Sequence, residues 1–179
     1  MARKSSRNTK ARIVSAAWKL FYEQGYEETT VEEIIFESET SKGSFYHYFD
    51  GKDALLSTLS SLFDEKYEEL TGLLTPEMTA MEQLLFLNRE LFHMIEDSIS
   101  LDLLARLYST QLTTNGEKHL LDHNRIYYKL LRKIIAKGQA EGQLSSRSNV
   151  NEMVKLYALC ERALLYDWCL CAGEYALTE

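Results

Sequence analysis

Two short helical patterns separated by a tight turn, between residues 30 and 48, constrain the fold of this chain more than any other feature. Thr30 and Glu33 form a capping box, in which the threonine bonds forward to the helix and the glutamate bonds back. This box opens a helix of only about two turns. A turn at residues 38–40 follows, and Ser41 caps the next helix. Such an arrangement is a helix-turn-helix, whose second helix enters the DNA major groove N-terminus first.

The second short helix and the residues after it, from Ser41 to Lys52, combine small, hydroxyl-bearing, aromatic and basic side chains. Tyrosine hydroxyls and histidine ring nitrogens can donate hydrogen bonds to phosphate oxygens. Phe45 and Phe49 are four residues apart and form the stripe that would hold this helix to a small core. A surface helix with ordinary aromatic packing is the alternative for this stretch taken alone.

Charge is distributed unevenly along the chain. The formal net charge is −7, yet residues 1–52 hold eight Lys/Arg and eight Asp/Glu, so the excess of acid lies in residues 53–179. This asymmetry fits a DNA contact confined to one end, although a disordered basic tail would look the same. Six basic residues precede the first acidic one, and five of them stand within the first twelve positions: Arg3, Lys4, Arg7, Lys10 and Arg12.

A longer helical pattern precedes the two short ones, over residues 9–24, and Gly25 suits a left-handed cap at its end. With the runs 29–34 and 41–49, followed by Lys52 and Leu55, residues 9–56 resemble the DNA-binding domain of the TetR family of transcriptional regulators. The resemblance implies an all-α fold: an N-terminal three-helix helix-turn-helix domain, joined through a fourth helix to a helical-bundle ligand-binding and dimerisation domain.

The resemblance also implies site residues. It places phosphate contacts at Thr30, Ser44, Tyr46, His47 and Lys52, and an approach to base edges at Ser41, Lys42 and Gly43. One position departs from the family pattern, since Glu39 stands in the turn where a glycine is usual. If this position needs a left-handed backbone, glutamate costs roughly 1 kcal/mol relative to glycine, and it brings a negative charge near the DNA.

The rest of the chain continues with helical patterns, and we expect domains at residues 1–52 and 53–179. A fourth helix of about twenty residues starts at Asp50 or Gly51, and later helices are expected near 78–97, 99–113, 117–141 and 149–173. The last one is apolar on more than one face, so either a second subunit covers it or it lies centrally in the core. The resemblance implies a homodimer formed through the last two helices.

Aromatic side chains with polar tips recur in the second domain. An apolar pocket with a few polar groups is what a small ligand needs, and the resemblance places such a pocket among the later helices. At ordinary helical spacing the same residues also fit a packed core. The candidates for ligand contact are Tyr67, Phe92, His93, Tyr108, Tyr127 and Trp168.

Other classes of protein find little support. The sequence contains no glycine-rich phosphate loop, nucleophile elbow or activated cysteine motif, so we expect no enzyme, and it calls for no cofactor. His119 and His123 have a metal-binding spacing without a third ligand, so we expect a solvated helix face and no metal. Without a long apolar run or an apolar signal core, we expect no membrane partner and a cytoplasmic location.

The sequence therefore predicts a ligand-responsive transcriptional regulator of the TetR type that acts as a repressor. Its dimer would bind a pseudo-palindromic double-stranded DNA operator, and a small apolar or aromatic effector would shift the fourth helix and release it. One alternative is a ligand-binding or scaffold protein on the same fold without specific DNA binding, which Glu39 keeps open. A small helical enzyme is the other.

Overall fold

The computed structural model describes the backbone of residues 2–113 and 118–178, and the side chains from residue 9 onward within these ranges. All regular elements in this part of the chain are helices, which confirms the predicted all-α class. The chain divides into two compact units, Met1–Leu59 and Ser60–Glu179, while the boundary predicted after residue 52 stays a prediction. Within the described ranges, no helix has both the length and the apolarity needed to cross a bilayer.

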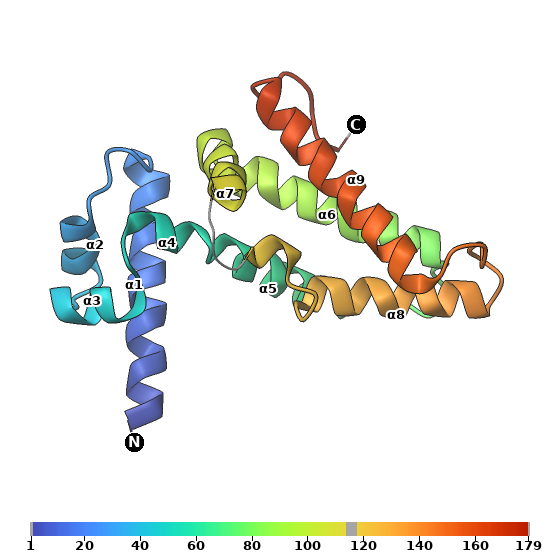
Figure 1. Ribbon diagram of the computed structural model, residues 1–179, viewed down its shortest axis with the longest axis horizontal. Helices are drawn as coiled ribbons and strands as arrows, with labels where there is room; N and C mark the ends of the chain where they lie inside the picture. The colour runs from blue at the N-terminus through green and yellow to red at the C-terminus, as the bar shows by residue number, and fades with distance from the viewer. Residues whose placement is uncertain (1, 114–117, 179) are drawn as a thin grey trace. The chain divides into compact units, whose positions relative to one another are not determined.

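The first unit is built on a long helix that carries two short ones. Its helices are α1 (Ala2–Gln24), α2 (Val31–Glu37), α3 (Lys42–Tyr48) and α4 (Lys52–Leu56), and α2 and α3 pack against α1 and against each other (Figure 1). The buried core joins all four helices through Ile13, Ala17, Phe21, Ile34, Phe45 and Leu55. The predicted three-helix arrangement is therefore present, and α4 extends it.

Helix α1 begins at Ala2, well before the predicted start at residue 9. The basic residues at the start of the chain therefore belong to this helix. Lys10 and Arg12 are described in full, whereas the side chains of Arg3, Lys4 and Arg7 lie outside the described residues.

The predicted fourth helix is wrong in one respect, because it is interrupted. Helix α4 ends at Leu56, and α5 (Leu59–Thr71) begins after a turn. In this turn the Ser57 hydroxyl donates to the Ala54 carbonyl at 2.7 Å, and the Thr58 hydroxyl donates to the Leu55 carbonyl at 2.6 Å. Serine and threonine hydroxyls that bond to nearby carbonyls compete with the helical ladder, which explains the break.

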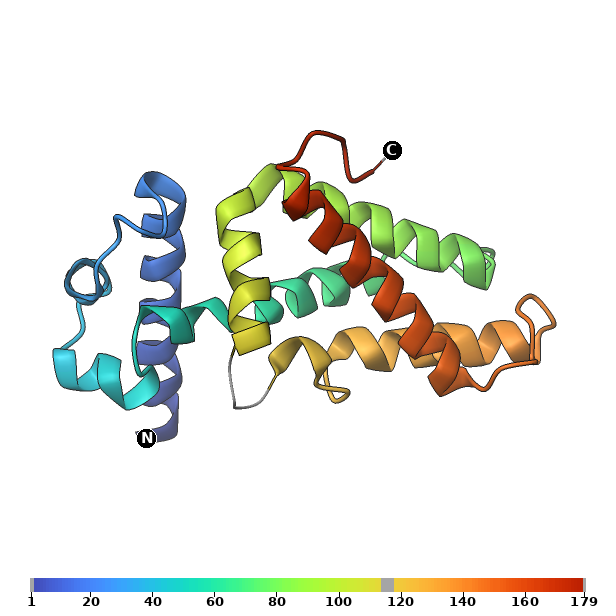
Figure 2. The ribbon, with the colours of Figure 1, turned by 45° about the horizontal axis from the view of Figure 1, so that its top comes forward.

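The second unit is a bundle of longer helices. After α5 come α6 (Ala80–Ser98), α7 (Leu101–Thr113), the short 3-10 helix η1 (His119–Leu121), α8 (Ile126–Ala140) and α9 (Val150–Leu170). Helix α9 packs on both α7 and α8, and α8 packs on α6. Figure 2 shows α9 running diagonally across α8. The ends of α6, α7 and α9 agree with the sequence prediction to within the usual few residues.

The helix predicted over 117–141 is shorter in the structure, and its residue 117 lies outside the described residues. Before α8 the chain forms η1 and then a turn, in which the Asp122 carboxylate accepts from the Asn124 N–H at 2.8 Å. Aspartate readily makes such local turns in place of helix. Arg125 then serves as the N-cap residue of α8.

Candidate nucleic-acid interface and effector cavity

The two short helices of the first unit are held at their N-termini as predicted. The Thr30 hydroxyl accepts from the Glu33 N–H at 3.2 Å, and the Glu33 carboxylate accepts from the Thr30 N–H at 2.8 Å. In α3 the Ser41 hydroxyl accepts from the Ser44 N–H at 3.1 Å. These caps fix where both helices start, so the first turn of α3 has a defined position.

Helix α3 divides into a buried side and an exposed side. Phe45 and Phe49 are buried, as their four-residue spacing predicts. The predicted contact residues lie on the other side: Ser41, Lys42, Gly43, Tyr46 and His47 are exposed and Ser44 is half-buried. At Gly43 an added Cβ would have only the Ser41 hydroxyl oxygen near it, at 4.0 Å, so the backbone here is open to a close approach.

Acidic side chains neutralise several basic residues of this unit. Lys42 pairs with Glu32 of α2 at 3.4 Å, and Lys19 pairs with Glu37 at 2.6 Å. The Lys42 and Glu32 side chains are 68% and 71% exposed, so water screens this pair and its strength is small. A phosphate or base edge can therefore replace Glu32 as the partner of Lys42.

Lys52, a predicted phosphate contact, is engaged inside the unit. Its ammonium group donates to the carbonyl oxygens of Tyr26 at 2.6 Å, Glu27 at 3.2 Å and Thr29 at 2.9 Å. An ammonium group has three N–H donors, so these contacts occupy all of them. In this structure Lys52 holds the segment that leads into α2, and its predicted role at phosphate stays a prediction.

The turn between α2 and α3 is strained at the position that departs from the family pattern. Glu39 has a φ of +49°, the left-handed region expected for that turn position. The Arg12 guanidinium donates to the carbonyl oxygen of Glu39 at 2.7 Å and also to that of Ser38. Arg12 thus ties α1 to this turn.

The second unit contains a small, partly open cavity of about 50 Å³. Three predicted ligand residues, Tyr67, Tyr108 and Tyr127, line it together, and the Tyr67 and Tyr127 rings lie 5.1 Å apart. The remaining lining residues are Phe63, Leu91, Leu120, Arg125, Glu161, Arg162 and Leu165. The cavity is therefore largely apolar, with charged groups at a few points of its wall.

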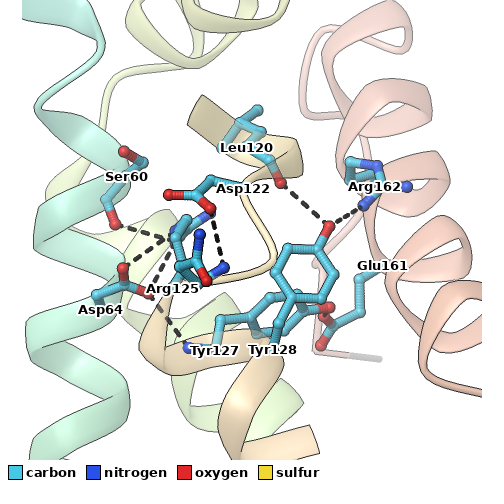
Figure 3. A network of polar contacts seen from close by, with 10 residues as sticks. Ser60, Asp64, Leu120, Asp122, Arg125, Tyr127, Tyr128, Glu161 and Arg162 are labelled. Atoms are coloured by element: carbon cyan, nitrogen blue, oxygen red, sulfur yellow. Dashed lines mark hydrogen bonds and ion pairs between the residues drawn. The ribbon is translucent and has the colours of Figure 1, made fainter. Parts of the chain in front are cut away.

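Glu161 of α9 is the buried acid of this cavity, and only 7% of its surface is exposed. Its carboxylate accepts from the Asn88 amide at 2.9 Å. It also accepts from the hydroxyl of Tyr127, whose ring lies beside it in Figure 3. Burial raises the pKa of Glu161, while the hydrogen bonds from Tyr127 and Asn88 act in the opposite direction. Burial and the neighbouring Glu161 charge also raise the pKa of Tyr127, so this phenol keeps its proton.

Two arginines stand at other points of the wall (Figure 3). Arg125 donates to both carboxylate oxygens of Asp64, each at 3.0 Å, and to the Ser60 carbonyl at 3.0 Å. Both side chains of this pair are mostly buried, at 10% and 16% exposed. Arg162 donates to the Tyr128 hydroxyl at 3.1 Å. The Arg125 pair connects the cavity wall directly to the first turns of α5.

Comparison with known proteins identifies the first unit. A family model described as bacterial regulatory proteins of the tetR family matches residues 13–59. Residues 13–59 therefore carry a TetR-family DNA-binding region. Over 62 residues, or 35% of the chain, it is 37% identical to the transcriptional regulator QacR of Staphylococcus aureus, and over 56 residues, or 31%, it is 43% identical to a helix-turn-helix regulator of Lactococcus lactis. These matches span only 33% and 29% of the two relatives' lengths.

A solved TetR-family structure extends the likeness to both units. The repressor FadR of Thermus thermophilus, in complex with lauroyl-CoA, superposes with a TM-score of 0.77 and 25% identity. The alignment covers 94% of this chain and 87% of that one. The TetR-family fold therefore includes the helical bundle that contains the cavity.

The structure does not bring the other three predicted ligand residues to this cavity. Phe92 is buried and borders a separate open groove of about 890 Å³ between α6, α9 and the residues after α9. His93 is exposed on α6. The indole N–H of Trp168 donates to the Tyr175 carbonyl at 2.8 Å, so Trp168 anchors the segment after α9.

Three charged residues of the cavity were missed from the sequence. Arg125 and Arg162 carry no pattern that distinguishes them from surface arginines. Glu161 does carry a distinguishing pattern, because it shares the helical spacing of the buried Val154, Ala158 and Leu165. An acid within an apolar stripe is a sign of a buried polar site. Among the described residues, no group of three or more His, Cys, Asp or Glu could hold a metal ion.

Proposed function

We propose that this protein is a ligand-responsive transcriptional regulator that binds a pseudo-palindromic DNA operator as a homodimer. In this role α3 lies in the major groove, and an effector in the second unit weakens DNA binding, so the output is repression. The proposed site of action is the cytoplasm, and the proposed role involves no enzymatic reaction.

The observation that carries this proposal is the exposed side of α3. Lys42, Gly43, Tyr46 and His47 lie on one open side of a helix whose other side is anchored by the buried Phe45. A recognition helix contacts base edges with its N-terminal residues, and neighbouring hydroxyls and N–H groups contact phosphate. We therefore assign base contacts to Ser41, Lys42 and Gly43, and phosphate contacts to Thr30, Ser44, Tyr46 and His47.

An exposed apolar face on α9 supports the homodimer. The helix buries Val154, Ala158, Leu165 and Trp168 on one side. Its opposite side leaves large apolar residues exposed at helical spacing: Leu156 at 62%, Leu159 at 53%, Tyr166 at 47% and Leu170 at 66%. A continuous apolar stripe of this kind is typical of a surface that a partner covers. A second copy pairing through α9 and the adjacent α8 forms a closed symmetric dimer, which requires a two-fold symmetric operator.

The covalent path from cavity to α3 is short. Asp64, the partner of Arg125, lies on α5, and α5 follows α4 after the Ser57–Thr58 turn. An effector that displaces Arg125 changes the restraints on α5. Effector and DNA then oppose each other with a coupling free energy of ~1–3 kcal/mol. The effector in this proposal is a small apolar or aromatic molecule.

The test is a gel-shift titration on DNA from immediately upstream of the protein's own coding region, at two salt concentrations. We expect tight, salt-sensitive binding that Lys42→Ala and Tyr46→Phe each weaken. Arg147→Ala is the matched control, because it removes an exposed basic residue from the loop between α8 and α9 in the second unit. Binding no tighter than to random DNA on every upstream fragment, and equal in all variants, would favour a ligand-binding protein without specific DNA recognition. The ion pairs of Lys42 and Lys19 are the observation that favours this second candidate.

An effector screen follows on the operator so defined. Lauroyl-CoA, which the Thermus thermophilus FadR structure contains, is one arm of the screen, and uncharged aromatic compounds are another. The cavity of about 50 Å³ is much smaller than an acyl chain requires, so we expect the small compounds to release DNA more effectively.

A further inference from the structure

We propose that the cavity around Tyr67 binds an uncharged ligand group that accepts hydrogen bonds, such as a ketone or amide carbonyl, on an apolar body. This inference names the chemical class of the effector and rests on the proposed function. It follows from which hydrogen-bonding groups of the cavity wall are satisfied and which are not.

The hydroxyl of Tyr67 is the unsatisfied group. The residue is 2% exposed, and its hydroxyl oxygen has no hydrogen-bond partner among the residues that the structure describes. Burial, and after it the charge of Glu161, raise the pKa of Tyr67, so the hydroxyl keeps its proton and can donate. A buried hydroxyl without a partner costs about 1–3 kcal/mol. A ligand oxygen that accepts from it would remove this cost.

The Glu161 carboxylate of the wall, and the Asp64 carboxylate that pairs with the wall residue Arg125, already have hydrogen-bond donors. The Glu161 carboxylate accepts from Asn88 and Tyr127, and both oxygens of Asp64 accept from Arg125. A cationic ligand would have to displace one of these donors before it could pair with a carboxylate. The wall therefore offers few hydrogen-bond acceptors to a ligand that can only donate hydrogen bonds.

Further donors remain in the wall. A guanidinium has five N–H groups, and among the described residues Arg162 uses one of them on the Tyr128 hydroxyl. An anionic ligand could use these donors, but it would lie beside the buried Glu161, and two like charges repel strongly away from water. An uncharged acceptor gains the donors without this repulsion.

The size and lining of the cavity determine how large and how apolar the rest of the ligand can be. Phe63, Leu91, Leu120 and Leu165 supply an apolar wall, and the present volume is about 50 Å³. A single water needs roughly 10–15 Å³ of cavity volume, so the cavity in its present size has room for a polar head but not for a whole effector. The apolar body of the ligand must then enlarge the cavity, next to the Arg125–Asp64 pair.

The experiment uses three probes with similar aromatic skeletons: acetophenone as the neutral acceptor, benzoate as the anion and 1-phenylethylamine as the cation. Ligand-observed NMR titrations on the full chain measure their dissociation constants. We expect acetophenone to bind most tightly and Tyr67→Phe to weaken its binding about fivefold to tenfold, because the variant lacks only the donating hydroxyl. Tyr22→Phe is the matched control, since Tyr22 is 78% exposed in α1.

Three results would overturn the inference: tighter binding of benzoate or the amine, equal binding of acetophenone to Tyr67→Phe, or no acetophenone binding up to its solubility. A melting curve without probes adds an independent check. We expect Tyr67→Phe to melt no lower than the unmodified protein, because it removes an unpartnered buried hydroxyl. A clear drop would reveal a hidden partner and equally overturn the inference. Loss of DNA binding in the gel-shift test, with Tyr67-dependent acetophenone binding intact, would reject the proposed function but leave this site standing.

Discussion

The guanidinium of Arg12 donates a hydrogen bond to the carbonyl oxygen of Glu39 at 2.7 Å, and Glu39 has the left-handed φ of +49°. The strained residue of the helix-turn-helix turn is therefore held by a side chain from the preceding long helix. The Glu39 carboxylate lies 3.6 Å from the same guanidinium but is 88% exposed, so this ion pair contributes little. Strain and charge at Glu39 can thus be separated by substitution.

Glu39→Gly should relieve the strain and stabilise the protein. A non-glycine residue in the left-handed region costs about 1 kcal/mol, so we expect an increase of this size in the free energy of unfolding measured by urea denaturation. Glu39→Gln keeps the strain and removes only the charge, so its stability should not change. Both variants should bind DNA more tightly. A decrease in stability for Glu39→Gly would show that the turn is not strained.

Glu32→Gln should strengthen DNA binding by freeing Lys42. The pair is 3.4 Å long and exposed, so we expect a gain of only a few-fold, larger at low salt than at high salt. In a Lys42→Ala background the same substitution should have a smaller effect, and the difference is the coupling between the two residues. Glu68→Gln, an exposed acid of α5, serves as the control. Equal gains in both backgrounds would mean that Glu32 acts only through general charge.

Gly138→Ala should destabilise the second unit. An added Cβ would lie 2.5 Å from the Cβ of Ala80 and 2.9 Å from a methyl carbon of Leu144. Because Ala80 has no flexible side chain to move, α6 and α8 must separate, at a cost of about 1–3 kcal/mol in urea denaturation. Gly43→Ala is the contrasting variant, since its space is open. It should leave stability unchanged or slightly higher while weakening DNA binding; unchanged DNA affinity would argue against the base contact at Gly43.

Glu161→Gln should alter how stability depends on pH. Burial raises the pKa of Glu161 above its ordinary 4.5, so the folded protein binds this proton more tightly than the unfolded chain. Stability from this residue is therefore greatest at low pH and falls as pH rises from about 4.5 through the folded pKa. The groups that face it are Tyr127 of α8, Asn88 of α6, and Tyr157 and Arg162 of α9.

Urea denaturation across this pH range measures the effect. We expect the stability of Glu161→Gln, relative to the unmodified protein, to increase with pH and then level off. The opposite slope would mean that the hydrogen bonds from Tyr127 and Asn88 outweigh burial and hold Glu161 ionised.

Leu159→Glu should weaken the proposed dimer. Leu159 is 53% exposed on the apolar side of α9, and a dimer through this face would bury the new carboxylate without a partner. We expect the dimer dissociation constant, measured by sedimentation equilibrium, to rise at least tenfold, roughly 1.4 kcal/mol. Leu112→Glu on α7 is the control, because Leu112 is 74% exposed and lies outside this face. Equal dissociation constants for the two variants would place the interface elsewhere.

Local signals in the sequence predicted most of the helices. The capping box at Thr30 and Glu33 and the serine cap at Ser41 each involve residues three apart, so neighbouring sequence alone determines them. The breaks after Leu56 and before Ile126 were not predicted. They depend on whether Ser57, Thr58 and Asp122 turn their side chains onto the backbone, and helical spacing of apolar residues continues through such breaks.

The sequence by itself determined the helical class and the helix-turn-helix arrangement, because each depends on contacts within a few residues. Only the tertiary structure decided which aromatic residues share a cavity. Tyr67, Tyr108 and Tyr127 meet there with Glu161, while His93 faces solvent and Trp168 holds the chain after α9. The physical reason is that partners separated by tens of residues, such as Asp64 and Arg125, are chosen by how the helices pack, which no local pattern specifies.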